Sequence, residues 1–373
     1  MIRLLLQLNL LMMLTSFAAS AVSLTAFTPG ELWPDDQGVP INAHGGGMLF
    51  HKGVYYWFGE HKIEGKAGNV AQVGVSVYSS RDLYNWKNEG VALAVSGTPG
   101  DPLEKGCIIE RPKVLFNAKT ARFVMWFHHE LKGKSYDASL AGLAVADHPA
   151  GPYRYVRSLR PNAGKWPAGV DEDFKSGKTG HAKHEEYLRR DLPGGQMSRD
   201  MTLFQDDDGT AYLLSSAENN ETLSLHELTP DYQDFTGRWA RLLPGGLNEA
   251  PAMFKKDGKY YLITSGCTGW NPNAARSFVA DSIWGPWTSL GNPVRGTPDE
   301  ENTTFHSQST YVLPAPGHPG EFIFLGDRWC EQNAIDGRYI WLPITWENGK
   351  PTLQWRDRWD LGTWTGAPSK YIN

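Results

Sequence analysis

The stretch MLFHKGVYYWFGE, residues 48–60, reads as two short strands joined by a tight turn. Apolar and aromatic residues flank a central Lys-Gly pair, a pattern typical of a β-hairpin. Similar hairpins recur four times: KVLFNAKTARFVMWFHHE (113–130), TLFQDDDGTAYLLSSAE (202–218), AMFKKDGKYYLITSG (252–266) and YVLPAPGHPGEFIFLGDRW (311–329). A repeat that runs from end to end of the chain decides the fold class.

Each hairpin is followed by a further pair of strand-like segments, such as GVSVYSSRDLYNWKNEG (74–90), and no long segment has a helical period. Five units of four strands predict an all-β fold, a five-bladed β-propeller. A pair of β-sandwich domains is the alternative, but no Pro/Ser-rich linker divides the chain. Residues 160–198, which are polar and rich in Gly and Lys, are expected to form a long loop between blades two and three.

The N-terminus has the pattern of a secretory signal: Arg3, an apolar run over residues 4–14, and a small-residue cleavage site ending at Ala21. We therefore expect cleavage after Ala21, a single propeller domain over residues 22–373, and a secreted or periplasmic protein. The net charge of −5 and the absence of a basic stripe argue against a nucleic-acid partner. No membrane partner is expected, and we expect a monomer.

A propeller binds its ligand where the innermost strands converge, so polar residues at the start of each first strand are the candidates. Four repeats offer one each: Glu110 in IIERPKVLF, Asp200 in SRDMTLF, Glu249 in NEAPAMF and Gln308 in FHSQSTYVL. Glycosidic cleavage needs a protonated acid and a second group that activates water. Glu249 is flanked by apolar residues, and Asp200 would be the like-charged neighbour that raises its pKa. Alternatively, these residues only line a solvated channel.

Six motifs carry a resemblance to a known family: ERPKV (110–114), SRDMTLF (198–204), EAPAMF (249–254), TSGCTGW (264–270), SQSTYVLP (307–314) and GDRW (326–329). They resemble the branch of glycoside hydrolase family 43 that holds exo-β-1,3-galactanases, in the right order over the whole chain after the signal. The resemblance implies a five-bladed propeller that inverts anomeric configuration. It further implies that Glu249 is the general acid, that Asp200 tunes and orients it, and that Glu110 and Glu60 bind sugar hydroxyls.

The first blade departs from most of the family. A segment like HADPSI usually supplies an aspartate as general base there, whereas this chain has NAHGGGML (42–49). The galactanase-like branch shares this departure and uses the glutamine of its SQST motif, which implies Gln308 as the base here. An amide is a poor base, so this assignment depends on the resemblance. His44 is a candidate substrate contact, and the glycines beside it let backbone or substrate approach closely.

Further contacts follow at the same site. The resemblance places Tyr136, Asn219, Asn220 and Thr268 near the sugar, with ordinary loop roles as the alternative. Trp270 and Trp329 are candidates for stacking on the apolar face of a sugar, with core packing as the alternative.

No cofactor is required and no metal ligand set is assigned. HAKHEE (181–186) and FHHE (127–130) lack the H-E-x-x-H spacing of a zinc site. A structural cation near the propeller axis stays open, with His306 as a residue expected near that axis. Cys107 and Cys267 either form a disulfide or remain free thiols.

The sequence thus predicts a secreted, exo-acting, inverting glycoside hydrolase with an oligosaccharide or polysaccharide substrate. The expected reaction is release of terminal galactose from β-1,3-galactan, the backbone of type II arabinogalactan. An exo-α-L-arabinofuranosidase or a galactofuranosidase of the same family is the alternative among enzymes, and the missing aspartate favours the galactanase. A non-catalytic carbohydrate-binding propeller is the alternative from another class, and the presence of Glu249 argues against it.

Overall fold

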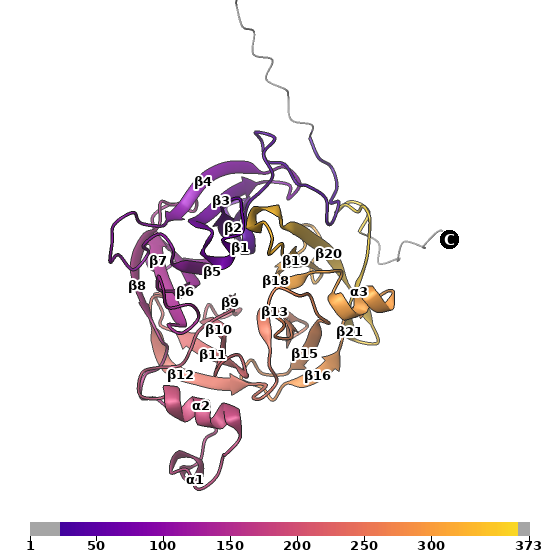
Figure 1. The fold of residues 1–373 in the computed structure, drawn as a ribbon. Coiled ribbons are helices and arrows are strands. Elements are labelled where there is room, and N and C mark those ends of the chain that lie inside the picture. The colour runs from indigo at the N-terminus through magenta and orange to yellow at the C-terminus, as the bar shows by residue number, and fades with distance from the viewer. Residues whose placement is uncertain (1–22, 365–373) are drawn as a thin grey trace, which may run out of the picture.

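The computed structural model describes residues 23–364, so the expected signal peptide at residues 1–21 lies outside the described residues. Five β-sheets form a ring around a central axis, as Figure 1 shows. This arrangement confirms the all-β class and the five-bladed propeller. None of the described helices is long and apolar enough to cross a membrane.

Each hairpin read from the sequence forms the first two strands of one blade, and four blades have four antiparallel strands in chain order. Blade one contains β1 (His44–His51), β2 (Val54–Lys62), β3 (Gln72–Ser80) and β4 (Lys87–Ala94). Blade two contains β5 (Ile108–Asn117), β6 (Arg122–Glu130), β7 (Leu140–Ala146) and β8 (Arg154–Leu159). Blade three contains β9 (Met201–Gln205), β10 (Ala211–Ala217), β11 (Thr222–Leu228) and β12 (Phe235–Leu242).

The last two blades follow the same plan with one addition. Blade four contains β13 (Glu249–Lys256), β14 (Lys259–Ser265), β15 (Arg276–Ala280) and β16 (Thr288–Gly291). Blade five contains β18 (Gln308–Pro314), β19 (Phe322–Arg328), β20 (Arg338–Glu347) and β21 (Lys350–Gln354), and β17 (Val294–Arg295) pairs in parallel with its outer edge. Short helices occupy connections: η1 (Gly68–Val70), α3 (Pro298–Thr303) and η2 (Ala334–Asp336).

Five apolar clusters fill the five spaces between neighbouring blades. The cluster between blades five and one closes the ring and is the most aromatic, because Trp57 and Trp341 pack there with their ring centroids 4.9 Å apart. The first and last parts of the described residues meet beside it, where Phe27 and Trp359 exchange backbone hydrogen bonds and pack their rings at 4.3 Å. Much of the aromatic content of the chain therefore belongs to the core.

A β-bulge recurs at the start of the innermost strand in blades one, two and four. The residue that follows His44, Glu110 or Glu249 has a left-handed backbone, with φ of 59° at Gly45, 55° at Arg111 and 51° at Ala250. The strand register shifts immediately afterwards in all three blades. Because a bulge re-aims the adjacent side chain, this repeated kink sets the directions of His44, Glu110 and Glu249.

The segment 160–198, expected to be a loop, instead carries two helices, α1 (Glu172–Lys175) and α2 (Lys183–Asp191), which project from the ring next to β12 (Figure 1). The charges of α2 explain its stability, because acidic residues lie in its first turn and basic residues in its last. The Glu185 side chain also accepts a hydrogen bond from the Ala182 N–H at 2.8 Å, and Leu188 is buried. A helix with so few apolar residues gives almost no periodic signal in the sequence.

Candidate active site

The four polar residues expected at the axis come together at one end of it. Glu110, Asp200, Glu249 and Gln308 line a single cavity of about 410 Å³, to which all five blades contribute. Side chains from different strands can meet there because the inner strands converge on the axis (Figure 1). The full lining is Glu60, Asn69, Glu110, Arg111, His128, Tyr136, Arg199, Asp200, Asn220, Glu249, Gly269, Trp270, Gln308 and Trp329.

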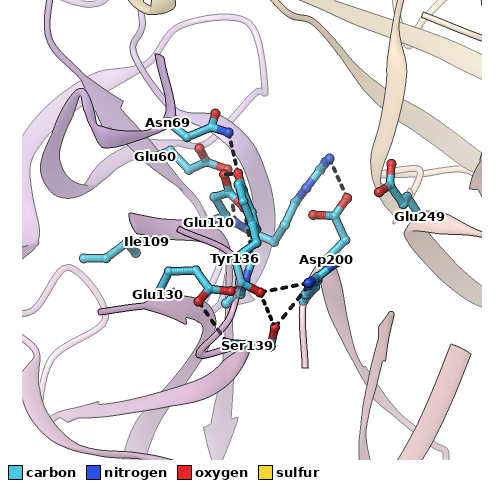
Figure 2. A network of polar contacts seen from close by, with 12 residues as sticks. Glu60, Asn69, Ile109, Glu110, Glu130, Tyr136, Ser139, Asp200 and Glu249 are labelled. Atoms are coloured by element: carbon cyan, nitrogen blue, oxygen red, sulfur yellow. Dashed lines mark hydrogen bonds and ion pairs between the residues drawn. The ribbon is translucent and has the colours of Figure 1, made fainter. Parts of the chain in front are cut away.

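Glu249 has the environment of a general acid. Burial and, after it, the negative charge of Asp200 together raise the pKa of its carboxyl to about 7, against the opposing charge of Arg111. Asn220 donates a hydrogen bond from Nδ2 to Oε1 of Glu249 at 2.5 Å. Figure 2 shows Glu249 beside Asp200. A carboxyl group with this pKa keeps a proton to donate near neutral pH.

Asp200 is fixed by two partners. Its Oδ2 atom pairs with the Arg111 guanidinium at 2.9 Å and accepts the Ala250 N–H at 3.1 Å. The second contact ties Asp200 to the residue after Glu249, so the two carboxyl groups are held in a set relation. Arg111 in turn donates its backbone N–H to Glu60 at 3.1 Å. Arg111 therefore connects Asp200 to Glu60 on the other side of the cavity.

Three hydrogen bonds hold the side chain of Gln308. Its Oε1 atom accepts from Nη2 of Arg111 at 2.5 Å and from Nε1 of Trp329 at 2.9 Å, while its Nε2 donates to Ser265 Oγ at 2.8 Å. Guanidinium and indole N–H groups only donate, so they fix which end of the side chain carries the oxygen. These contacts suit the ordinary amide form of Gln308, and its role as base stays a prediction from the resemblance.

The opposite wall is built from acidic groups of blades one and two. Glu110 accepts the Tyr136 hydroxyl at 2.6 Å and pairs with Nδ1 of His128 at 2.9 Å (Figure 2 shows Glu110 and Tyr136 together). Burial opposes its charge, but the hydrogen bond and charge of His128 and the charge of Lys62 lower the pKa of Glu110 to about 2. Glu60 pairs with Lys62 at 2.8 Å. Both carboxylates are placed to accept hydroxyl hydrogen bonds.

The two tryptophans stand at the cavity. Trp270 and Trp329 both line it, with their ring centroids 6.2 Å apart at an angle of 81°. The Arg111 guanidinium lies 5.1 Å from the Trp329 ring, in the geometry of a cation–π contact. The structure therefore places both rings at the ligand cavity rather than in an apolar cluster.

Three expected contacts lie outside the cavity lining. His44 is fully buried, 5.5 Å from the Tyr339 ring in a stacked pair, and Glu60 from the paired strand takes the place toward the cavity. Asn219 directs its backbone N–H to the sulfur of Met197 at 3.4 Å. Thr268 is exposed and bonds within its own loop. None of the three is therefore part of the cavity lining, and their direct contact with a sugar stays a prediction.

The structure also bears on two points that the sequence left open. His306, expected near the axis, is half exposed, with Nε2 2.9 Å from an oxygen of Asp299, and it lines a small pocket with Trp270, Gln308 and Trp329. The disulfide is not formed, since Cys107 and Cys267 are free thiols. Cys107 packs in the cluster between blades one and two. Cys267 belongs to blade four, and its sulfur lies 4.0 Å from the backbone carbonyl oxygen of Asn220 in blade three.

Three side chains of the cavity lie close enough together to suggest a metal site. Glu110, His128 and Asp200 each place a ligand atom within 4.8 Å of the others. Both ring nitrogens of His128, however, are already bonded to carboxylates, those of Glu110 and Glu130. No lone pair of the ring is left to bind an ion, and a cation near the axis stays a prediction.

Several lining residues were missed at the sequence level. Arg111 and Arg199 stand directly beside Glu110 and Asp200 in their motifs, so adjacency alone was a usable signal. Other lining residues had weaker signals: His128 pairs with Glu110 across the hairpin, and Asn69 comes from the short η1 turn.

Comparison with known proteins agrees with this geometry. The family model for glycosyl hydrolases family 43 matches residues 179–351. A family 43 β-1,3-galactosidase solved with galactodeoxynojirimycin has 50% sequence identity and a TM-score of 0.85, and the match covers 90% of this chain and 100% of that one. The chain belongs to glycoside hydrolase family 43. Its propeller and the acidic cavity at its axis are therefore those of a family 43 member.

Two other family 43 relatives differ in what they act on. A variant of an exo-β-1,3-galactanase from Phanerochaete chrysosporium, solved with β-1,3-galactotriose, has 32% identity and a TM-score of 0.74 over 90% of this chain and 68% of that one. A β-D-galactofuranosidase from Aspergillus niger is 34% identical over 144 residues, which is 35% of this chain and 42% of that protein. The chain thus spans less than half the length of this curated relative.

Proposed function

We propose that the chain is an exo-acting, inverting glycoside hydrolase that releases galactose from the end of β-1,3-galactan. The observation that carries the proposal is Glu249, a carboxyl group with a pKa of about 7 that faces Asp200 in a cavity walled by all five blades. A cavity with walls from all five blades suits the end of a sugar chain better than the middle of one.

The reaction is a single displacement at the anomeric carbon. Glu249 gives its proton to the glycosidic oxygen as the bond from that oxygen to the anomeric carbon breaks. A water molecule forms the new bond from the opposite face, which inverts the configuration, and Gln308, the base that the resemblance implies, accepts the proton that the water loses. Arg111 and Trp329 hold the Gln308 amide in place for this step. Glu60 and Glu110 accept hydrogen bonds from the sugar hydroxyls.

The proposed sugar rests on the relatives. Two of the similar structures are named as acting on β-1,3-linked galactose, and one of them holds β-1,3-galactotriose. A galactofuranosidase is the second candidate, because a curated family member with that activity matches part of the chain. The absence of an acidic residue from the segment 42–49 favours the galactanase.

The proposal is tested by incubating the protein with β-1,3-galactan, with a galactofuranoside and with arabinan, followed by product analysis. Galactose from β-1,3-galactan alone, first seen as the inverted anomer by proton NMR, is the expected result. Release of arabinose alone, or of galactose from the furanoside alone, would contradict it. Galacto-oligosaccharides of mixed length would contradict the exo mode.

We also propose export, and that the chain acts as a monomer. The support for export is the signal-like pattern that ends at Ala21. Expression of the full chain in a host with a secretory pathway, followed by N-terminal sequencing, should show a mature protein that starts at Val22. Size-exclusion chromatography with light scattering tests the monomer, for which a mass of twice the chain would be the contrary result.

A further inference from the structure

The histidine of the FHHE segment that lines the cavity is clamped between two buried carboxylates. His128 is fully buried, with Nδ1 2.9 Å from Oε2 of Glu110 and Nε2 2.9 Å from Oε1 of Glu130. Glu110 is 8% exposed and faces the cavity, whereas Glu130 is fully buried behind the ring. The three side chains therefore form a line that leads from the cavity into the blade.

Both ends of this line are fixed. The second oxygen of Glu130 accepts the Ser139 N–H at 2.9 Å, and the second oxygen of Glu110 accepts the Tyr136 hydroxyl at 2.6 Å. Arg199 holds the same loop by donating to the Tyr136 carbonyl at 2.8 Å and to Ser139 Oγ at 3.1 Å. Neither carboxylate can turn away from the ring without losing one of these bonds.

The next residue gives the contrast. His129 points to the other face of β6, as alternation along a strand requires. Its Nε2 lies 2.9 Å from the Pro102 carbonyl and its Nδ1 lies 2.7 Å from Ser158 Oγ. A carbonyl only accepts, so Nε2 carries the hydrogen, and Nδ1 accepts from the hydroxyl. His129 is therefore satisfied as a neutral ring, and burial lowers its pKa to about 4.

A neutral ring cannot satisfy both partners of His128. It has one N–H donor and one lone pair, and the lone pair would face a carboxylate oxygen at hydrogen-bond distance. An imidazolium donates at both nitrogens and neutralises one of the two negative charges. Although burial opposes that charge, the hydrogen bonds and charges of Glu110 and Glu130 raise the pKa of His128 to about 9.

We propose that His128 and Glu130 are positioning residues that keep the Glu110 carboxylate ionised and fixed in direction at the cavity. An ionised carboxylate is an acceptor at both oxygens, so Glu110 then selects a ligand that presents a hydroxyl donor at this wall. The inference deepens the proposed function, because the hydroxyl is that of the terminal sugar. It also explains how Glu110 stays charged although the carboxylates of Glu60 and Asp200 share the cavity.

The first test needs no substrate. In the intact protein labelled with nitrogen-15 at histidine, the His128 ring should show two protonated nitrogens at pH 7.5, and His129 should show one. The Glu130→Gln variant removes a negative charge and should move the His128 titration to lower pH. A ring of His128 with one unprotonated nitrogen at pH 7.5 would show that the ring is neutral and would overturn the proposal.

The second test uses His128→Gln, with His129→Gln as the matched control from the same strand. The amide of the first variant supplies no positive charge, so the pKa of Glu110 rises and the carboxyl takes up a proton as pH falls. We expect kcat/KM at pH 7.5 to fall about 10- to 100-fold, with a new loss of activity between pH 7.5 and pH 5. His129→Gln should leave the shape of the pH profile unchanged.

The outcomes separate this proposal from the proposed function. If β-1,3-galactan is not cleaved but His128 shows two protonated nitrogens, the proposed reaction is wrong. The charged state proposed for His128 between Glu110 and Glu130 is then still correct. The pH profile is then replaced by calorimetric binding of galactodeoxynojirimycin to wild type and His128→Gln. A wild-type profile in His128→Gln, or the same change of profile in His129→Gln, would overturn the positioning role. Thermal melting of both variants confirms that each is folded.

Discussion

Blades one and four begin with the same backbone kink and use it in opposite ways. In blade four the first residue of the inner strand, Glu249, reaches the cavity, and a left-handed Ala250 follows it. In blade one the corresponding residue, His44, is fully buried against Tyr339, and a left-handed Gly45 follows it. The shared geometry therefore does not decide which side chain meets the ligand.

The difference comes from the second strand. Glu60 of β2 pairs in register with His44, and its carboxyl group occupies the space where a side chain at residue 45 would lie. A Cβ atom built on Gly45 would lie 2.3 Å from Oε1 of Glu60 and 3.3 Å from Trp329. In blade one the carboxylate at the cavity is therefore Glu60 of β2, which occupies the space that Gly45 leaves free. In blade four it is Glu249 of β13.

Removing the acid of blade four should have the largest effect. Glu249→Gln keeps the shape and the contact with Asn220 but has no proton to give, so we expect kcat to fall about 10³- to 10⁴-fold on β-1,3-galactan, at the upper end of general-acid effects. In the wild type, activity should be lost as pH rises through about 7, because the acid must be protonated.

Substrates with different leaving groups provide the control. An aryl galactoside with an acidic phenol needs little protonation, so Glu249→Gln should retain far more of its activity on it. Equal losses on both substrates would mean that Glu249 does not act as the acid.

The water side of the cavity offers the next comparison, between Gln308→Ala and Gln308→Glu. If Gln308 holds or activates the attacking water, the alanine variant should lose about 10²-fold in kcat. The glutamate variant restores an oxygen that can accept from Arg111 and provides an ordinary base, so it should lose less than alanine. Steady-state kinetics of both variants at several pH values provide the measurement.

A near-wild-type Gln308→Ala would show that another group receives the proton of the water. A glutamate variant as inactive as alanine would show instead that the amide itself, with its donor to Ser265, is what the site needs.

The sequence predicted the blades well for a physical reason. Strand alternation and Gly-containing turns are local, and they recur in every repeat, so five hairpins could be read without any knowledge of contacts. The places of Glu249 and Asp200 at the cavity were also predictable, because both residues open inner strands that must converge. The pattern E-x-P at residues 110–112 and 249–251 accompanies the bulge in two of the three blades that have it.

The remaining site residues depend on long-range packing. Asn220 reaches Glu249 from a turn in another blade, and Asn69 meets Tyr136 from the connection after β2. His44 was expected at the cavity because its position in the repeat matches that of Glu249. Nothing local shows that Glu60 from the second strand takes its place, and α2 was missed because its outer faces are polar.

The smallest expected effect tests the gap in blade one. Gly45→Ala adds one methyl group where the Glu60 carboxyl lies, so Glu60 must move and lose its hydrogen bond from the Arg111 N–H. We expect kcat/KM to fall about 10-fold, the size of one charge-assisted hydrogen bond at the lower end of its range, with most of the change in KM.

Gly38→Ala is the matched control, because Gly38 also has a left-handed φ, 79°, but no atom lies within 4 Å of its added Cβ. Both variants carry the same kind of backbone strain, about 1 kcal/mol, and should melt at similarly lowered temperatures. Only Gly45→Ala should lose activity, since only there does the methyl group meet a residue of the cavity. If Gly45→Ala keeps its KM, the wall can take in a side chain without moving Glu60. The glycine would then serve the backbone kink alone, as the alanine at residue 250 does in blade four.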